Sequence, residues 1–360
     1  MTDVCEMPVK QPQTPSKALA LLLVVAGGSL ILGIFWMASR YPSLLGKAAS
    51  LPGYEPKSFV YTNVLMEAGA DAGFWEKVVA TFVNWCWSMR IGMTFGLTFG
   101  AMLHTAFRYF PLRTGDSVYL NTLKGILIGA PAGVCVNCAV PVACGLTRAR
   151  NKVELALGFM LSSPSLNIIV VSMIVTAFPW QFAAVHFSVI AIVLLIVLPL
   201  MVKMFHGTQS APSAALHDMA PVERPSAGDV VKTYLFNLWK LFRTAVPMML
   251  AAAAMAAVAV QLIPFEKVFA DAGFAMVAAA AFLTTLLPAP IAMEVLVAHH
   301  LFTAQVAAPF VMLFLCTLGS YSILPMIYLW QEVSRKIAVG LYLSFVVLGI
   351  AAAHAVTWLM

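Results

Sequence analysis

Apolar runs long enough to cross a lipid bilayer recur along the whole chain, and they restrict its fold more than any other feature. Examples cover residues 18–38, 182–202 and 337–359. About 20 apolar residues in a helix span the hydrocarbon core, where only helices or closed barrels satisfy the backbone. Only 10% of the residues are charged, against roughly 25% in soluble domains. The sequence therefore predicts an all-α polytopic membrane protein.

One apolar segment, residues 129–147, is interrupted by residues that break helices. It contains Pro131 and Pro141 together with three glycines, so a straight helix cannot run through it. A membrane tolerates the freed backbone groups only where protein buries them or water reaches them. Broken apolar helices are therefore the best indication of a transport site in a single sequence. A similar break follows at residues 287–290, which read Leu-Pro-Ala-Pro.

Basic residues flank the first broken segment on both sides, with Arg113 before it and Arg150 after it. If the segment were an ordinary span, one basic cluster would lie outside the cytoplasm, which the positive-inside tendency disfavours. We therefore expect a re-entrant hairpin over residues 118–147 and a cytoplasmic N-terminus. The formal charge of +6 lies in short connecting segments, so it indicates topology and not a nucleic-acid-binding surface.

The chain also divides into two halves with matching residues. At one offset Asn84 and Arg90 match Asn237 and Arg243, and at an offset two residues longer Phe159, Ser162, Ser165 and Ile168 match Phe314, Thr317, Ser320 and Ile323. Each half would contain three spans and one hairpin. Because an odd number of spans reverses the chain direction, the halves would be inverted repeats, as in many secondary transporters.

These patterns assign each part of the chain. The expected parts are a cytoplasmic N-terminus at 1–17, a first transmembrane helix at 18–38, an extracytoplasmic loop at 39–77, a first repeat at 78–202 with its hairpin at 118–147, a cytoplasmic linker at 203–235, and a second repeat at 236–360 with its hairpin at 272–301. The spans of the second repeat are expected near 236–263, 304–330 and 337–359. The first apolar run exceeds the roughly 7 to 15 residues of a cleavable signal core, so we expect it to be retained; cleavage after Ala38 is the alternative.

Cys135 and Cys138 are the first candidates for binding residues. Their spacing places both on one side of a helix, and thiolates bind soft, thiophilic species. They could equally form a redox pair, and the structural alternative is that buried cysteines are small apolar fillers. The longer repeat offset places Met293 opposite Cys138 and Glu294 opposite Ala139, so both hairpins would present sulfur to a shared midplane cavity.

Glu294 is the candidate for proton coupling. An ionisable group inside a membrane segment is costly enough to indicate a function. The alternatives are a structural ion pair and an exposed hairpin end. Ser163 and Asn167 follow the first break and would hydrogen-bond the hairpin or line the path; adhesion between helices is their structural alternative.

The residues around the first break resemble a known family. The chain is similar to the predicted-permease family that includes the ArsP-type organoarsenical efflux permeases. In that family a Cys-Ser-Cys and a following Pro lie in a broken apolar stretch, and a Phe-Leu-x-Ser-Pro-x-x-Asn signature occurs at the next span. Pro141 matches the first element, Ser163-Pro164-Ser165-Leu166-Asn167 matches the second, and Cys135 and Cys138 depart from it as Cys-x-x-Cys.

Together these observations predict a secondary-active permease in a bacterial inner membrane. It would export a small, soft, thiol-reactive solute through Cys135, Cys138, Pro141, Ser163, Asn167 and Met293, and the resemblance implies a trivalent organoarsenical as the first candidate. No P-loop is present, so an ion gradient would supply the energy. We expect no enzymatic activity, cofactor, bound metal or nucleic-acid partner; the partners are the solute, the lipid bilayer and, in a homo-oligomer, further copies of the chain.

Two other function classes stay open. A thiol–disulfide electron relay through Cys135 and Cys138 would need a reactive attacking thiol and an accessible partner, and only the first half has a close cysteine pair. A copper or other soft-metal transporter would use the same cysteines together with methionines.

Overall fold

The computed structural model describes residues 17–50, 65–69, 71–110, 115–148, 152–205, 226–262 and 273–360. Within these ranges the chain is helical and forms no strand apart from an isolated bridge between Leu318 and Tyr321. By length and composition, four of the described helices can cross a membrane, or five if a bent pair counts as one span. This confirms the predicted all-α membrane protein.

The N-terminal helical segment is longer than the sequence predicts. Helix α1 (Lys17–Phe35) passes through a π-helical turn, η1 (Trp36–Arg40), into α2 (Tyr41–Ser50). The predicted first helix ends at residue 38, yet the backbone stays helical for twelve further residues. Pro42 permits this because it stands in the first turn of α2, next to the wider π turn, where its missing N–H costs little. The rest of the expected loop up to residue 64, like residues 1–16, lies outside the described residues.

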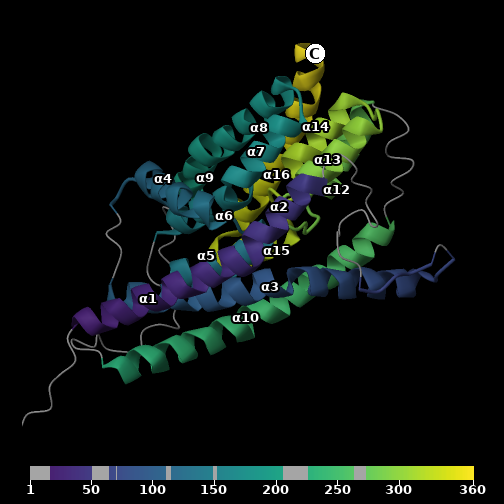
Figure 1. Ribbon diagram of the computed structural model, residues 1–360. Coiled ribbons are helices and arrows are strands. Elements are labelled where there is room, and N and C mark those ends of the chain that lie inside the picture. The colour runs from purple at the N-terminus through teal and green to yellow at the C-terminus, as the bar shows by residue number, and fades with distance from the viewer. Residues whose placement is uncertain are drawn as a thin grey trace, which may run out of the picture.

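Two helices of 36 residues each lie side by side along one edge of the molecule, α3 (Phe74–Tyr109) and α10 (Ala227–Leu262). Helix α1 lies against both, as Figure 1 shows. Helix α10 begins inside the region that the sequence assigned to a linker; residues 206–225 of that linker are outside the described part of the chain.

Each long helix is followed by a pair of short helices with a break between them, then by a broken helix, and then by a closing helix. After α3 these are α4 (Val118–Gly129), η3 (Ala130–Ala132) and α5 (Val136–Arg148), then α6 (Val153–Ser165) and α7 (Ile168–Ala177), then α8 (Trp180–Ile192), η4 (Val193–Val197) and α9 (Leu198–Phe205). After α10 they are α12 (Phe274–Thr284) and α13 (Met293–Thr303), then α14 (Ala308–Thr317), α15 (Ile323–Tyr328) and η5 (Leu329–Val333), then α16 (Arg335–Leu359).

Both broken helices are interrupted near their middle. The axes of α6 and α7 differ by 41° across the break at residues 166 and 167. The sequence indicated a single span over residues 304–330, but the structure divides it between α14 and α15. Gly319 accounts for the division, because its φ of 84° lies in the left-handed region, where glycine is favoured.

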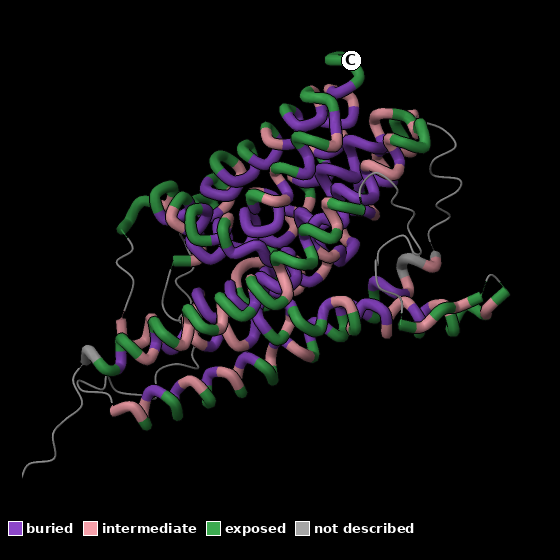
Figure 2. Tube along the Cα trace, viewed as in Figure 1, coloured by how far each residue is buried: buried purple, intermediate pink, exposed green. Residues whose placement is uncertain are grey.

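The core lies where α5 meets α6 and where α13 meets α14. Every residue of α6 after Val153 is buried, as is every residue from Phe310 to Thr317 in α14, and Figure 2 shows this continuous buried region. By contrast, α1, α10 and α16 expose large apolar side chains such as Leu22, Trp239 and Val347. Such faces suit contact with lipid, so the helix breaks sit inside protein, as the membrane requires.

Candidate functional site

The four candidate groups of the two hairpins lie at the starts of α5 and α13. Cys135 immediately precedes α5 and Cys138 is in its first turn, while Met293 and Glu294 open α13. Their exposed fractions are 2%, 1%, 0% and 4%. All four side chains are therefore enclosed by protein.

Asn137 forms hydrogen bonds with two breaks of the second half, the one between α12 and α13 and the one between α14 and α15. Its Nδ2 donates to the carbonyl oxygen of Ala289 at 3.3 Å, and its Oδ1 accepts from the Ser322 hydroxyl at 2.6 Å. A residue in the first turn of α5 thus contacts both the second hairpin break and the break between α14 and α15. Sequence reasoning missed Asn137, although its position between Cys135 and Cys138 was a usable signal.

The carbonyl oxygens of the second break are all paired with protein donors. Every carbonyl oxygen from Leu286 to Ile291 accepts a hydrogen bond. In chain order the donors are the N–H of Ile323, the N–H of Ala289, the Trp85 indole, the Asn137 amide, the N–H of Met293 and the Lys47 ammonium. Such complete pairing is what a break at membrane depth needs, because each unpaired group there costs several kcal/mol.

Cys135 caps the helix that carries Cys138. Its Sγ accepts a hydrogen bond from the backbone N–H of Cys138 at 3.3 Å, and its carbonyl accepts from Ala139 at 3.0 Å. The Sδ of Met89 lies 3.9 Å from the Cys135 Sγ. Both cysteines are free thiols, so the start of α5 presents two thiols and a neighbouring thioether, which are soft ligands.

Three glycines of α3 make room for α5. A Cβ on Gly92 would lie 2.5 Å from the Cys138 Sγ, one on Gly96 would lie 2.5 Å from the Cys138 carbonyl oxygen, and one on Gly100 would lie 2.6 Å from the Pro141 carbonyl oxygen. Small residues at four-residue spacing let membrane helices approach closely. The spacing is visible in the sequence, and it was the signal that could have located the α3–α5 contact.

We expect Gly96→Ala to destabilise the protein by about 1–3 kcal/mol, the usual cost of overpacking. The new methyl group would press on a backbone carbonyl, which cannot turn away. Gly92→Ala is the matched control, because its methyl group would meet the Cys138 side chain, which can rotate. Thermal unfolding in detergent compares the two variants; equal midpoints for Gly96→Ala and the parent would contradict the close α3–α5 contact.

Pro141 lies inside α5, where it removes the N–H that would pair with the Asn137 carbonyl. Its ring also packs on α3, with Cγ 3.4 Å from the point where a Gly96 Cβ would be. The structure therefore places Pro141 at the contact between α5 and α3. Whether Pro141 touches solute stays a prediction.

Ser163 and Asn167 both face the first break. The Ser163 hydroxyl accepts from the backbone N–H of Val134 at 3.1 Å, which matches one of the two roles expected for it. The Asn167 Oδ1 caps α7 by accepting from Ile169 at 3.1 Å. Its Nδ2 is buried without a hydrogen-bond partner and lies 2.8 Å from where a Gly133 Cβ would be. Gly133 has a φ of 61°, so this close approach depends on glycine.

Glu294 is buried beside the break between α14 and α15. Its Oε2 has no hydrogen-bond partner and lies 3.0 Å from the point where a Gly319 Cβ would be. The neighbouring Ser320 hydroxyl is also buried without a partner. The alternative of an exposed hairpin end is wrong for Glu294. Within the part of the chain that the structure describes, Glu294 forms no ion pair within 4.0 Å either.

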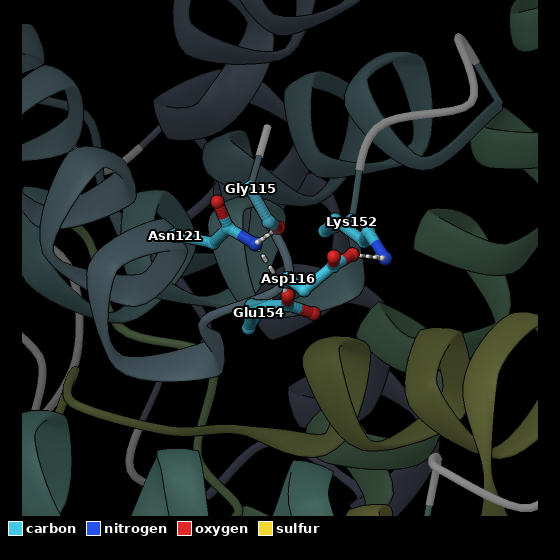
Figure 3. A network of polar contacts seen from close by, with 5 residues as sticks. All are labelled: Gly115, Asp116, Asn121, Lys152 and Glu154. Carbon is cyan, nitrogen blue, oxygen red and sulfur yellow. Dashed lines mark hydrogen bonds and ion pairs between the residues drawn. The ribbon is translucent and has the colours of Figure 1, made fainter. Parts of the chain in front are cut away.

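A second buried carboxylate, Glu154 in α6, forms a hydrogen bond with α4. Asn121 in α4 donates to the Glu154 Oε1 and to the Gly115 carbonyl, each at 2.8 Å, as Figure 3 shows. Nearby, Lys152 and Asp116 form an ion pair at 3.9 Å with largely exposed side chains. Sequence reasoning did not single out Glu154, although an acidic residue in an apolar helix is a recognisable signal.

We expect Asn121→Ala to lower the free energy of unfolding by about 1–3 kcal/mol, because the Glu154 carboxyl loses its buried donor. Lys152→Ala is the control, since an exposed ion pair contributes less than about 1 kcal/mol. Denaturation midpoints in detergent measure both variants. A larger loss for Lys152→Ala than for Asn121→Ala would contradict the assignment.

Comparison with known proteins identifies the family. The model of the family described as "Predicted permease", of the ArsP type, matches residues 78–357. The chain belongs to this permease family. UPF0718 protein YraQ of Escherichia coli (strain K12) is 26% identical to it over 272 residues, which cover 75% of this chain and 78% of the relative. No solved structure matches the chain.

Family membership supports a membrane transport function for this permease rather than an enzymatic one. The matched region begins within α3 and ends within α16, so it includes both hairpins and both broken helices. Helices α1 and α2 lie outside it. The parts of the site that come from those two helices therefore lie outside the matched region.

Proposed function

We propose that this permease carries a small, soft, thiol-reactive solute across a bacterial inner membrane, outward and by secondary active transport. The observation that supports this most is the meeting of the two helix breaks. Cys135 and Cys138 lie at one break and Met293 and Glu294 at the other, all are buried, and Asn137 bonds the breaks to each other. Broken helices that meet in a membrane core are typical of transporter binding sites.

The solute would bind at the sulfur groups. A trivalent organoarsenical with two hydroxyl groups is the first candidate: both thiols attack arsenic, two As–S bonds form, two As–O bonds break, and two water molecules leave. No electron is gained or lost, so the reverse reaction with water releases the solute. The family resemblance favours this candidate, and the softness of thiolate ligands supports it.

Transport would follow from two inverted repeats that rock against each other. The recurring order of elements supports this: α3 and α10 have equal lengths, and each precedes a hairpin, a broken helix and a closing helix. The inverted relation itself rests on the predicted cytoplasmic location of the N-terminus and of Arg113 and Arg150, which lie outside the described residues. Labelling of single cysteines at these two positions tests it, and reaction from opposite sides would contradict it.

A soft metal ion is the second candidate solute, because the Met89 thioether lies next to Cys135 and because Met293 opens the facing helix. Cu(I) suits such sulfur ligands. An electron relay through Cys135 and Cys138 is the third class. It would require the two thiols to cycle between reduced and oxidised forms in the membrane.

Everted membrane vesicles separate the three classes. We expect vesicles that contain the permease to accumulate trivalent methylarsenic above vesicles that lack it. Accumulation of Cu(I) without arsenic would favour the second candidate. A Cys135–Cys138 disulfide that forms and disappears with respiration, without solute accumulation, would favour the relay and contradict the permease.

A further inference from the structure

The N-terminal helical segment brings two cationic side chains to the candidate site. Arg40 ends η1 and Lys47 lies in α2, so both precede the region that the family model matches. Their charges act on the site: Arg40 and Lys47 both interact electrostatically with Cys135, and Lys47 also interacts with Glu294. The sequence had assigned these residues to a loop, so nothing in the repeat pattern indicated them.

The Lys47 ammonium donates one hydrogen bond at the second break and has further N–H groups available. Its Nζ donates to the Ile291 carbonyl at 2.6 Å, two residues before Met293. An ammonium group carries three N–H donors. Among the described residues this is the one hydrogen bond that the Lys47 ammonium makes, so two of its donors are left for another group.

Arg40 lies next to Cys138. The point where a Gly92 Cβ would be is 2.5 Å from the Cys138 Sγ and 3.7 Å from the Arg40 Nη2, so the guanidinium and the thiol lie on the same side of α3. The guanidinium stacks over the Phe35 ring at 4.7 Å. Its Nε is buried without a hydrogen-bond partner, and it makes no ion pair with any residue that the structure describes.

Two cations, Arg40 and Lys47, and one carboxylate, Glu294, lie around the starts of α5 and α13. The Glu294 Oε2 lacks a hydrogen-bond partner, and within the described ranges no ion pair within 4.0 Å joins Glu294 to either cation. The starts of α5 and α13 add partial positive charge, because helix N-termini carry it. Arg40 and Lys47 are half-buried in a segment that can cross a membrane, where positive charge is costly unless an anion accompanies it.

We propose that Arg40 and Lys47 form an anion subsite beside Cys135 and Cys138, so that the solute combines a soft, thiol-reactive atom with an anionic group such as a carboxylate or sulfonate. This rests on the proposed function and names its substrate class. The soft atom bonds to the cysteines, and the anionic group pairs with the guanidinium and the ammonium. Helices that lie outside the matched region thereby select the solute.

Alkylation of the two cysteines tests the subsite without a transport assay. Iodoacetate and iodoacetamide have nearly the same size and differ in charge, and both react by the same displacement of iodide. The purified full chain is treated with each reagent, and mass spectrometry follows Cys135, Cys138 and the half-buried Cys86, which is the internal reference. The ratio of the two rates isolates attraction of the anion, because any change in thiolate content affects both rates equally.

We expect the iodoacetate-to-iodoacetamide ratio at Cys135 and Cys138 to exceed that at Cys86 by about tenfold, a modest value for electrostatic attraction in an enclosed site. The double variant Arg40→Gln, Lys47→Met removes this excess. Lys77→Met, which removes one positive charge in the first turn of α3, is the control and keeps it. The same ratio at all three cysteines of the parent, or an unchanged excess in the double variant, overturns the subsite.

A matched pair of arsenicals distinguishes failure of the subsite from failure of the proposed function. Phenylarsine oxide is neutral, and its 4-carboxy derivative is anionic. We expect the parent to bind the carboxylated compound about tenfold more tightly than the neutral one, and the double variant to bind both alike. Equal binding of both by the parent overturns the subsite alone. Binding of neither, together with normal transport by Cys135→Ser, overturns the proposed function as well.

Discussion

Cys135→Ser and Cys138→Ser should each abolish transport of the soft solute while leaving the protein folded. Serine keeps the size of the side chain but loses the soft sulfur ligand, and we expect a fall in the transport rate of about tenfold or more. Folding should survive for a specific reason. At position 135 a serine oxygen can accept the same hydrogen bond from the N–H of Cys138 that caps α5, because serine is a favoured N-cap residue.

The measurement is solute uptake into everted vesicles, with thermal unfolding as the check on folding. Cys86→Ser is the control, since Cys86 lies half-buried on α3 and has no place in the proposed site. If both single variants transport at the rate of the parent, the cysteines only pack, and the proposal of a thiol-reactive solute loses its main support. Equal loss in Cys86→Ser would indicate a general effect of serine in these helices.

Glu294→Gln should retain solute binding and exchange but lose uphill transport driven by a pH gradient. Glutamine resembles the protonated carboxyl and cannot release a proton. The side chain is enclosed, with its Oε2 beside Gly319 and without a hydrogen-bond partner. A carboxyl in this position can take a proton from one side and release it to the other as the hairpins move.

Reconstituted vesicles with an imposed gradient provide the assay, and counterflow without a gradient measures exchange. Glu154→Gln is the matched control, because Glu154 is equally buried but already bonded to Asn121 at the hairpin base. We expect this control to keep gradient-driven uptake. Uptake that survives in Glu294→Gln would mean that the coupling proton travels by another route, with His299 and His300 on the same helix as the next residues to substitute.

The sequence alone determined the membrane class and the breaks that prolines mark. Long apolar runs allow only helices in a bilayer, and Pro131, Pro288 and Pro290 lack the N–H group that an α-helix interior needs. The expected break at Pro141 is wrong, because α5 continues through this proline from Val136 to Arg148. These are local properties, so no partner is needed to predict them. The sequence likewise placed Cys135, Cys138, Met293 and Glu294 at the two breaks. It did not locate the break between α14 and α15, because no proline marks residues 318–322 and Gly319 adopts its left-handed conformation only in the packed structure.

Only the tertiary structure decided how the breaks are completed. The carbonyls of the second break receive donors from Lys47, Trp85 and Asn137, which precede it by roughly 150 to 240 residues, and those partners depend on which helices pack against one another. Arg40 and Lys47 were expected in a loop. The packing of the N-terminal helical segment instead places them near the cysteines. A residue's own covalent structure determines how well it fits in a helix. The donor that pairs with a freed carbonyl, or the charge that faces a thiol, comes from a distant segment, and local sequence patterns do not specify which one.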